Sequence, residues 1–140
     1  MLGRETELLR FESWLGTVVA ADAGPRVFGL WGAAGMGSSR LLRELTWRAQ
    51  LRLSVLRARP EQPVGRLLQV ALGLPGVVNS RRSVVAAASV LRESAEPLLL
   101  VVEDIERLAS EDQELLVTLV RSLGVGGNLA VLLSSRSAWR

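Results

Sequence analysis

The stretch RVFGLWGAAGMGSSRLLREL, residues 26–45, holds the pattern that best predicts the fold. Its first part, residues 26–31, fits a short buried strand, and a glycine-rich turn follows at residues 32–37. Beyond the turn, apolar side chains recur at helical spacing, at Leu41, Leu42, Leu45 and Ala49. The sequence therefore predicts a strand, a glycine loop and a helix in direct succession.

Strand and helix patterns alternate on both sides of this unit. Further strands are predicted over residues 53–58, 98–102 and 129–134, and helices over residues 5–21, 64–72, 80–94 and 110–123. Ser110 and Gln113 fit a capping box at the start of the last helix. The alternation predicts an α/β fold in three layers, a parallel sheet of about four strands with helices on both faces.

The composition indicates one domain with an aliphatic core. The chain has 140 residues, of which 49% are hydrophobic and only 4% aromatic. The net charge is +3, and all 17 basic residues are arginines, with Arg81-Arg82 as the only adjacent pair. Because the arginines are scattered along the chain, solvated helix faces are favoured over a nucleic-acid site.

The absent residue types exclude several kinds of chemistry. The chain has no Cys and no His, so disulfides, thiol nucleophiles, Cys-based zinc sites and histidine bases are ruled out. The N-terminus lacks the basic and apolar pattern of a signal peptide. The longest apolar run, residues 98–102, is too short to cross a bilayer. We expect a cytoplasmic protein that does not contact a membrane.

The glycine loop has the spacing of a phosphate-binding loop but lacks its lysine. Set against G-x-x-x-x-G-K-[ST], it matches at Gly32, Gly37 and Ser39, and Ser38 stands in the lysine position. A loop between a strand and a helix can hold phosphates with backbone N–H groups and the helix N-terminus. A tight turn that binds nothing is the alternative.

Paired acids follow the apolar run of residues 98–102. Glu103 and Asp104 come at its C-terminal end, where ligands bind in open α/β sheets. A solvated strand end explains the same two residues equally well. Farther along, Arg136 follows the last predicted strand, and a surface arginine is the alternative there.

These residues resemble the AAA-like STAND ATPases, the large bacterial signalling NTPases. GAAGMGSSRLLREL, residues 32–45, is similar to their GxxGxGKSRLLxEL run, and residues 3–8 are similar to their opening GREaEL box. Residues 98–105 resemble their hhhhDD Walker B strand, and LLSSR, residues 132–136, their sensor strand, which ends in T-x-R. The four motifs occur in order and cover nearly the whole chain. The resemblance implies a P-loop NTPase core over residues 1–140.

The resemblance also implies a nucleotide site. Backbone from Ala34 to Ser39 would wrap the phosphates, and residues 3–5 would lie near the adenine. Ser39 would bind Mg²⁺, Glu103 would hold a magnesium-bound water, Asp104 would polarise the attacking water and Arg136 would sense the terminal phosphate. The implied nucleotide-binding residues are Gly3, Arg4, Glu5, Gly32, Ala34, Gly35, Met36, Gly37, Ser38, Ser39 and Arg40; the catalytic ones are Glu103, Asp104 and Arg136; the metal-binding ones are Ser39 and Glu103.

Departures from the family pattern predict poor hydrolysis. Ser38 supplies no charge to the phosphates, and losing one such contact commonly slows a reaction about a hundredfold to a thousandfold. Glu103 stands where the family has Asp, and Ala109 where a further Asp often follows. The family's fifth strand and helical lid would also be missing after Arg140. Without them, residues 27–31 are expected to form an unpaired apolar edge.

Three functions remain open at this point. The first is a degenerate regulatory domain of a signalling ATPase, which binds ATP or ADP with Mg²⁺ weakly and acts through protein contacts. The second is an active ATPase in which Arg136 or a neighbouring subunit replaces the lysine. The third is a scaffold without nucleotide. The expected partners are other domains or subunits of a signalling assembly, with a homo-oligomer among the alternatives; membrane and nucleic acid are disfavoured.

Overall fold

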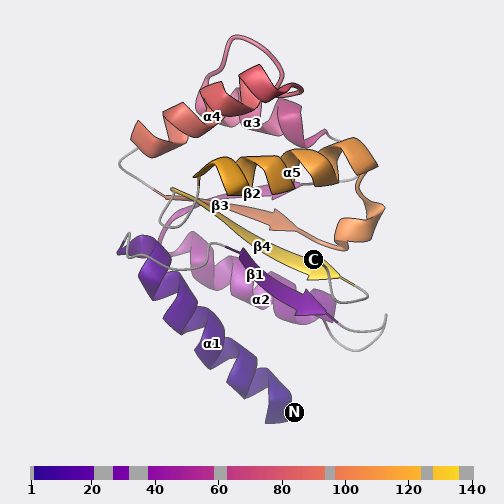
Figure 1. Ribbon diagram of the computed structural model, residues 1–140. Helices are drawn as coiled ribbons and strands as arrows, with labels where there is room; N and C mark the ends of the chain where they lie inside the picture. Colours follow the sequence, from indigo (N-terminus) through magenta and orange to yellow (C-terminus); the bar gives the residue numbers. More distant parts are fainter. Residues whose placement is uncertain are drawn as a thin grey trace.

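The computed structural model describes residues 2–20, 27–31, 38–58, 63–93, 97–123 and 128–135. Its elements, in chain order, are α1 (Leu2–Val19), β1 (Val27–Trp31), α2 (Ser38–Gln50), β2 (Ser54–Ala58), α3 (Val64–Leu72), α4 (Arg81–Glu93), β3 (Leu98–Val102), the 3-10 turn η1 (Ile105–Arg107), α5 (Ser110–Leu123) and β4 (Leu129–Ser135). Helices lie on both sides of a central sheet (Figure 1).

The sheet confirms the predicted α/β class. Its four strands are all parallel, in the order β1-β4-β3-β2. Strand β4 pairs with β1 and with β3, so that Val131 lies opposite both Val27 and Leu100. Within the described ranges β1 pairs on one side only, which agrees with the edge position expected for it.

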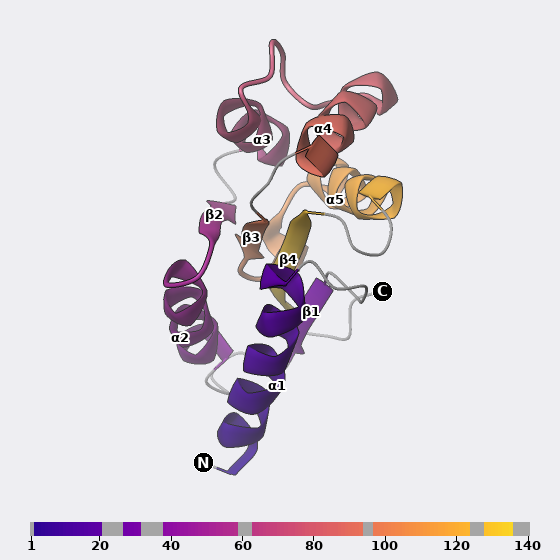
Figure 2. The same cartoon turned by 90° about the vertical axis from the view of Figure 1, so that its left-hand side faces the viewer.

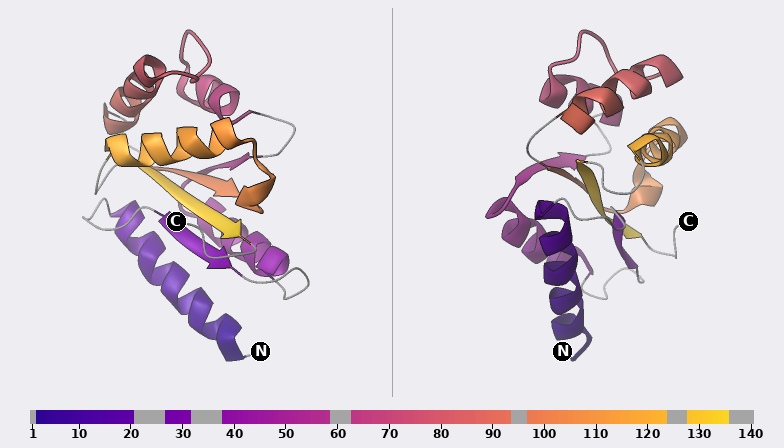
Figure 3. Two further views of the ribbon diagram at one scale, coloured as in Figure 1. Left: turned by 45° about the vertical axis from the view of Figure 1, so that its right-hand side comes forward. Right: turned by 60° about the vertical axis from the view of Figure 1, so that its left-hand side comes forward.

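Each face of the sheet has its own apolar core. Helices α3, α4 and α5 cover one face, and α1 and α2 cover the other (Figures 2 and 3). Because side chains alternate along a strand, Leu100 packs on the α3–α5 side while Leu99 packs on the α1–α2 side, both fully buried. Strand β3 is apolar throughout, as expected of a central parallel strand covered on both faces.

Several predicted boundaries are exact. Helix α3 occupies the predicted residues 64–72 and β3 the predicted residues 98–102, whereas α1 begins at Leu2, earlier than predicted.

The predicted capping box at the start of α5 is wrong. Gln113 donates its side-chain Nε2 to the carbonyl oxygen of Leu108, 3.0 Å away, and its backbone N–H bonds to the carbonyl of Ala109 at 3.1 Å. Ser110 is the first residue of α5 and not its cap.

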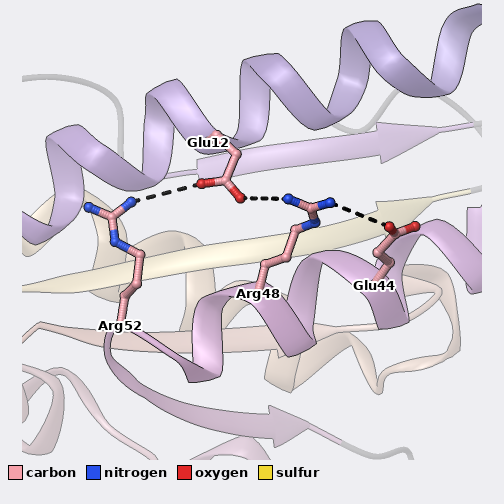
Figure 4. Close-up of polar contacts among 4 residues, drawn as sticks. All are labelled: Glu12, Glu44, Arg48 and Arg52. Carbon is pink, nitrogen blue, oxygen red and sulfur yellow. Dashed lines mark hydrogen bonds and ion pairs between the residues drawn. The ribbon is translucent and has the colours of Figure 1, made fainter.

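Ion pairs fasten α1 to α2 across their outer sides. Arg48 contacts Glu12 at 3.1 Å and Glu44 at 3.6 Å, and Arg52 contacts the other Glu12 oxygen at 3.9 Å (Figure 4). These side chains are about one-third exposed, so each pair contributes about 0–1 kcal/mol. Apolar packing between the two helices and the sheet therefore contributes most of the stability of this contact. No helix in the described part of the chain is both long and apolar enough to span a membrane.

Candidate functional site

Parallel pairing brings the segments that follow β1 and β3 and the end of β4 to one edge of the sheet. Strands β1, β3 and β4 are neighbours and point the same way, so their C-terminal ends lie side by side (Figure 1). Helix α2 begins at Ser38, after the loop that leaves β1. Glu103 and Asp104 follow β3, and Ser134 and Ser135 end β4. This edge is the ligand-binding position of open α/β sheets.

The turn after β3 is held by the end of β4. Asp104 has φ 50° and ψ 72°, the left-handed region that L-residues rarely adopt. Its backbone N–H donates to the hydroxyl of Ser134 at 2.8 Å. On the other side of the strand, the hydroxyl of Ser135 donates to the Glu106 carboxylate at 2.5 Å. Two buried serines thus tie the acidic turn to the sheet.

Strand alternation indicates which way the two serines face. Ser134 continues the series of Ala130 and Leu132, which pack on the α1–α2 side. Ser135 continues the series of Val131 and Leu133, which pack on the α3–α5 side. Ser134 therefore lies on the same side of the sheet as helix α2, which follows the glycine loop.

The two predicted acids differ in exposure. Glu103 is exposed, and Asp104 is partly buried. No group of three or more carboxylates within the described ranges could hold a metal ion alone. Mg²⁺ is commonly held by one or two carboxylates together with waters and substrate phosphates.

Many of the predicted nucleotide-binding residues lie outside the described residues. These are Gly32, Ala34, Gly35, Met36 and Gly37 of the loop, together with Arg136 of the expected sensor. Ser38 and Ser39 open α2, and Arg40 is exposed in its first turn. Residues 3–5 lie in the first turn of α1, and α1 and α2 both start toward the edge at which the strands end (Figure 3).

Sequence reasoning missed Glu106 and gave no role to Ser134 and Ser135. The signal was present, because two hydroxyl residues end an otherwise apolar strand. Buried polar groups of this kind are almost always hydrogen-bonded. Their partners could not be named, since each contact joins residues about thirty positions apart in the chain.

Comparisons with solved structures define the fold. The chain superposes on Drosophila ORC bound to AT-rich DNA and Cdc6, with a TM-score of 0.69, 16% identity, and coverage of 96% of this chain and 47% of that one. Its fold matches the AAA+ core of that structure. A second structure, Drosophila ORC bound to DNA, gives the same score and identity over 96% of this chain and 78% of that chain. A third structure, C. elegans PCH-2, gives a TM-score of 0.57 and 12% identity, over 94% of this chain and 38% of that chain.

These likenesses concern the fold of the AAA+ core alone. The chain spans less than half of two of the three matched chains. No protein-family model matches the sequence, and no curated protein matches it either. The more specific STAND resemblance therefore stays a prediction.

The left-handed conformation of Asp104 leads to a stability prediction. Asp104→Gly is expected to raise the free energy of unfolding by about 0.5 kcal/mol. Relief of the left-handed backbone, about 1–2 kcal/mol for an L-residue, exceeds the extra chain entropy of glycine, about 0.5–1 kcal/mol. Asp104→Ala is the control, because it also removes the carboxylate but keeps the Cβ. In urea unfolding, Asp104→Gly should be more stable than Asp104→Ala. The reverse order of stability would show that the turn is unstrained.

Proposed function

We propose that this AAA+ core is a degenerate regulatory nucleotide-binding domain of a signalling protein. It binds ATP or ADP weakly together with Mg²⁺, hydrolyses the nucleotide slowly or not at all, and acts through contacts with other protein segments. The observation that carries the proposal is the meeting of three parts at one sheet edge. These are the start of α2 at Ser38, the acidic turn at Glu103 and Asp104, and the buried Ser134 that holds this turn.

The start of α2 supports binding of phosphate. The first N–H groups of a helix lack partners within the helix and carry about half an elementary positive charge. Ser38 and Ser39 add two hydroxyl groups there. When bound, Mg²⁺ neutralises charge on the phosphate oxygens. Ser39 and Glu103 are the residues proposed to hold it.

The same residues argue against fast turnover. A lysine at position 38 would place a fixed positive charge beside the phosphates, and Ser38 offers only a neutral hydrogen bond. Asp104 keeps a carboxylate at the strand end, in a turn that Ser134 restrains. The proposed site thus keeps part of the expected catalytic arrangement without its main charge. Such a site suits a domain whose state depends on occupancy and not on turnover.

The test is a calorimetric titration of ATP and ADP with Mg²⁺ into the chain and into Ser38→Lys. The natural chain should bind weakly, and Ser38→Lys about tenfold tighter or more, because a charge-assisted hydrogen bond contributes about 1.5–3 kcal/mol. Ser89→Lys is the matched control. It makes the same substitution at an exposed position of α4 and should leave the affinity unchanged.

Three outcomes would overturn the proposal. Binding by Ser38→Lys alone would indicate a scaffold that has kept the fold and lost the nucleotide. No binding by either protein would show that the loop is only a turn. Turnover of the natural chain at a rate that Ser38→Lys does not raise would instead favour an ATPase with another source of charge.

A further inference from the structure

A groove lies on the α3–α5 side of the sheet, the face opposite to helix α2. Its walls are the start of α3, the segment before α4 and the first half of α5, and its volume is about 620 Å³. Val77, 40% exposed, and Leu115 give it an apolar lining. Glu111, Asp112 and Glu114 also line it. This acidic groove thus combines apolar contact area with negative charge.

The three carboxylates of the acidic groove are available to a partner. None of them takes part in an ion pair or a side-chain hydrogen bond with any residue in the described ranges. Glu111 and Glu114 are exposed. They belong to an acidic stretch, because residues 103–114 contain six carboxylates and a single arginine.

The groove wall is preformed. The backbone N–H of Val78 donates to the carbonyl of Gly65 at 3.2 Å, which ties the segment before α4 to α3. The hydroxyl of Ser83 accepts the backbone N–H groups of Asn79 and Ser80, both at 2.9 Å. A rigid wall lowers the entropy that a partner loses on docking.

Helix α2 carries a surface of opposite charge. Arg40, Arg43 and Trp47 recur at helical spacing along its exposed side, and Leu51 follows in the turn directly after the helix. We call these four residues the basic face. Trp47 is 60% exposed and Leu51 is 69% exposed, which is uncommon for such large apolar side chains. Neither arginine forms an ion pair within the described part of the chain. Residues 40–59 contain six arginines and one glutamate, so the arginines are less scattered than the whole-chain pattern indicates.

The two surfaces cannot meet within one molecule. Helix α2 covers one face of the sheet, and α3, α4 and α5 cover the other (Figure 2). Residues of these three helices and of the segment before α4 line the acidic groove. We propose that the acidic groove takes the basic face of a second copy of this chain. Arginine side chains of α2 meet the carboxylates of α5, while Trp47 and Leu51 cover Val77 and Leu115. A contact of this kind uses two different patches, so copies add head to tail.

The first test is the mass of the chain in solution as a function of concentration, measured by sedimentation. The average mass should rise with concentration and fall again at high salt, because exposed charge pairs are screened. A chain that stays monomeric up to its solubility limit overturns the proposal.

The decisive test mixes two variants. Arg43→Glu with Trp47→Glu removes the basic face, and Glu111→Gln with Glu114→Gln neutralises the acidic groove. A neutral groove gives the new carboxylates of the first variant no opposite charge to pair with. Each variant alone should be monomeric, since it keeps only one of the two surfaces. An equal mixture should give a dimer and nothing larger, because one basic face and one acidic groove remain intact. Arg66→Glu with Val70→Glu, on the exposed side of α3, is the matched control and should associate like the natural chain.

Other outcomes would name a different occupant. Association of the acidic-groove variant by itself would show that two basic faces meet symmetrically, which overturns the proposal. Monomeric behaviour of the mixture overturns it as well. Binding of a DNA duplex that is lost with Arg43→Glu, by a chain that never self-associates, would assign the basic face to nucleic acid. Circular dichroism and thermal unfolding check that each variant is folded.

Discussion

Gly65→Ala is expected to destabilise the fold by about 3 kcal/mol or more, near the upper end of overpacking effects. A Cβ atom at this position would lie 2.0 Å from the carbonyl oxygen of Val78 and 3.0 Å from its carbonyl carbon. These are backbone atoms, so they cannot rotate aside as the end of a side chain would. The methyl group fits only if the segment before α4 moves away from α3. Urea unfolding followed by circular dichroism measures the loss.

Gly16→Ala is the matched control for Gly65→Ala. Both glycines lie inside helices, and a Cβ at Gly16 would meet nothing within 4 Å. Alanine is favoured over glycine in a helix by about 0.5–1 kcal/mol, so Gly16→Ala should stabilise the chain. The two substitutions are chemically identical but have opposite expected signs. A Gly65→Ala protein as stable as the natural chain would show that α3 does not contact the segment before α4 closely.

The close approach of α3 and the segment before α4 at Gly65 also shapes the acidic groove. The carbonyl of Gly65 accepts the N–H of Val78, and both residues line the groove. A partially folded Gly65→Ala protein should therefore lose self-association together with stability. The charge variants of the basic face and the acidic groove should lose association alone. Comparing the two sets separates a damaged fold from a damaged surface.

The sequence was most informative where local chemistry marks both ends of an element. Pro63 and Gly73 bracket α3, and Pro97 and Glu103 bracket β3, so both elements could be predicted with their exact bounds. Gly73 adopts φ 65°, as a helix-ending glycine commonly does. The order of the strands required more than local pattern, because it depends on which strands pair.

The start of α5 shows why a local motif can mislead. Ser110 and Gln113 have the spacing of a capping box, yet the Gln113 side chain reaches back to the carbonyl of Leu108. The 3-10 turn over Ile105–Arg107 brings that carbonyl within reach. A turn of three residues leaves almost no periodic trace in a sequence. The competing partner could therefore not be predicted.

The candidate site, too, could be predicted only in part. The position of Glu103 and Asp104 at the end of a buried strand followed from the apolar run before them. The left-handed backbone of Asp104 and its bond to Ser134 could not be predicted, because they depend on a strand that lies thirty residues farther along. The basic face needed the fold as well. The fold is needed to show that Trp47 and Leu51 are exposed and lie beside the arginines of α2 on one surface.

Phe11→Ala is the second substitution with a large expected effect, about 3–5 kcal/mol of lost stability. Phe11 is fully buried, and its ring lies 5.7 Å from that of Trp14 and 5.5 Å from that of Phe28 on β1. The contact with Phe28 is edge-on, an arrangement that stabilises aromatic pairs beyond their buried area. This cluster joins α1 to the strand that leads into the glycine loop. Thermal and urea unfolding measure the loss.

Leu9→Ala provides the comparison, because Leu9 lies on the same helix with 73% of its surface exposed. It should change stability by no more than about 0.5 kcal/mol. If Phe11→Ala were equally mild, α1 would be loosely attached, and the ion pairs of Glu12 could not hold it, since each contributes about 0–1 kcal/mol. The proposed place of residues 3–5 beside an adenine depends on firm attachment. A Phe11→Ala protein that stays folded should therefore also bind nucleotide more weakly, and Leu9→Ala should not.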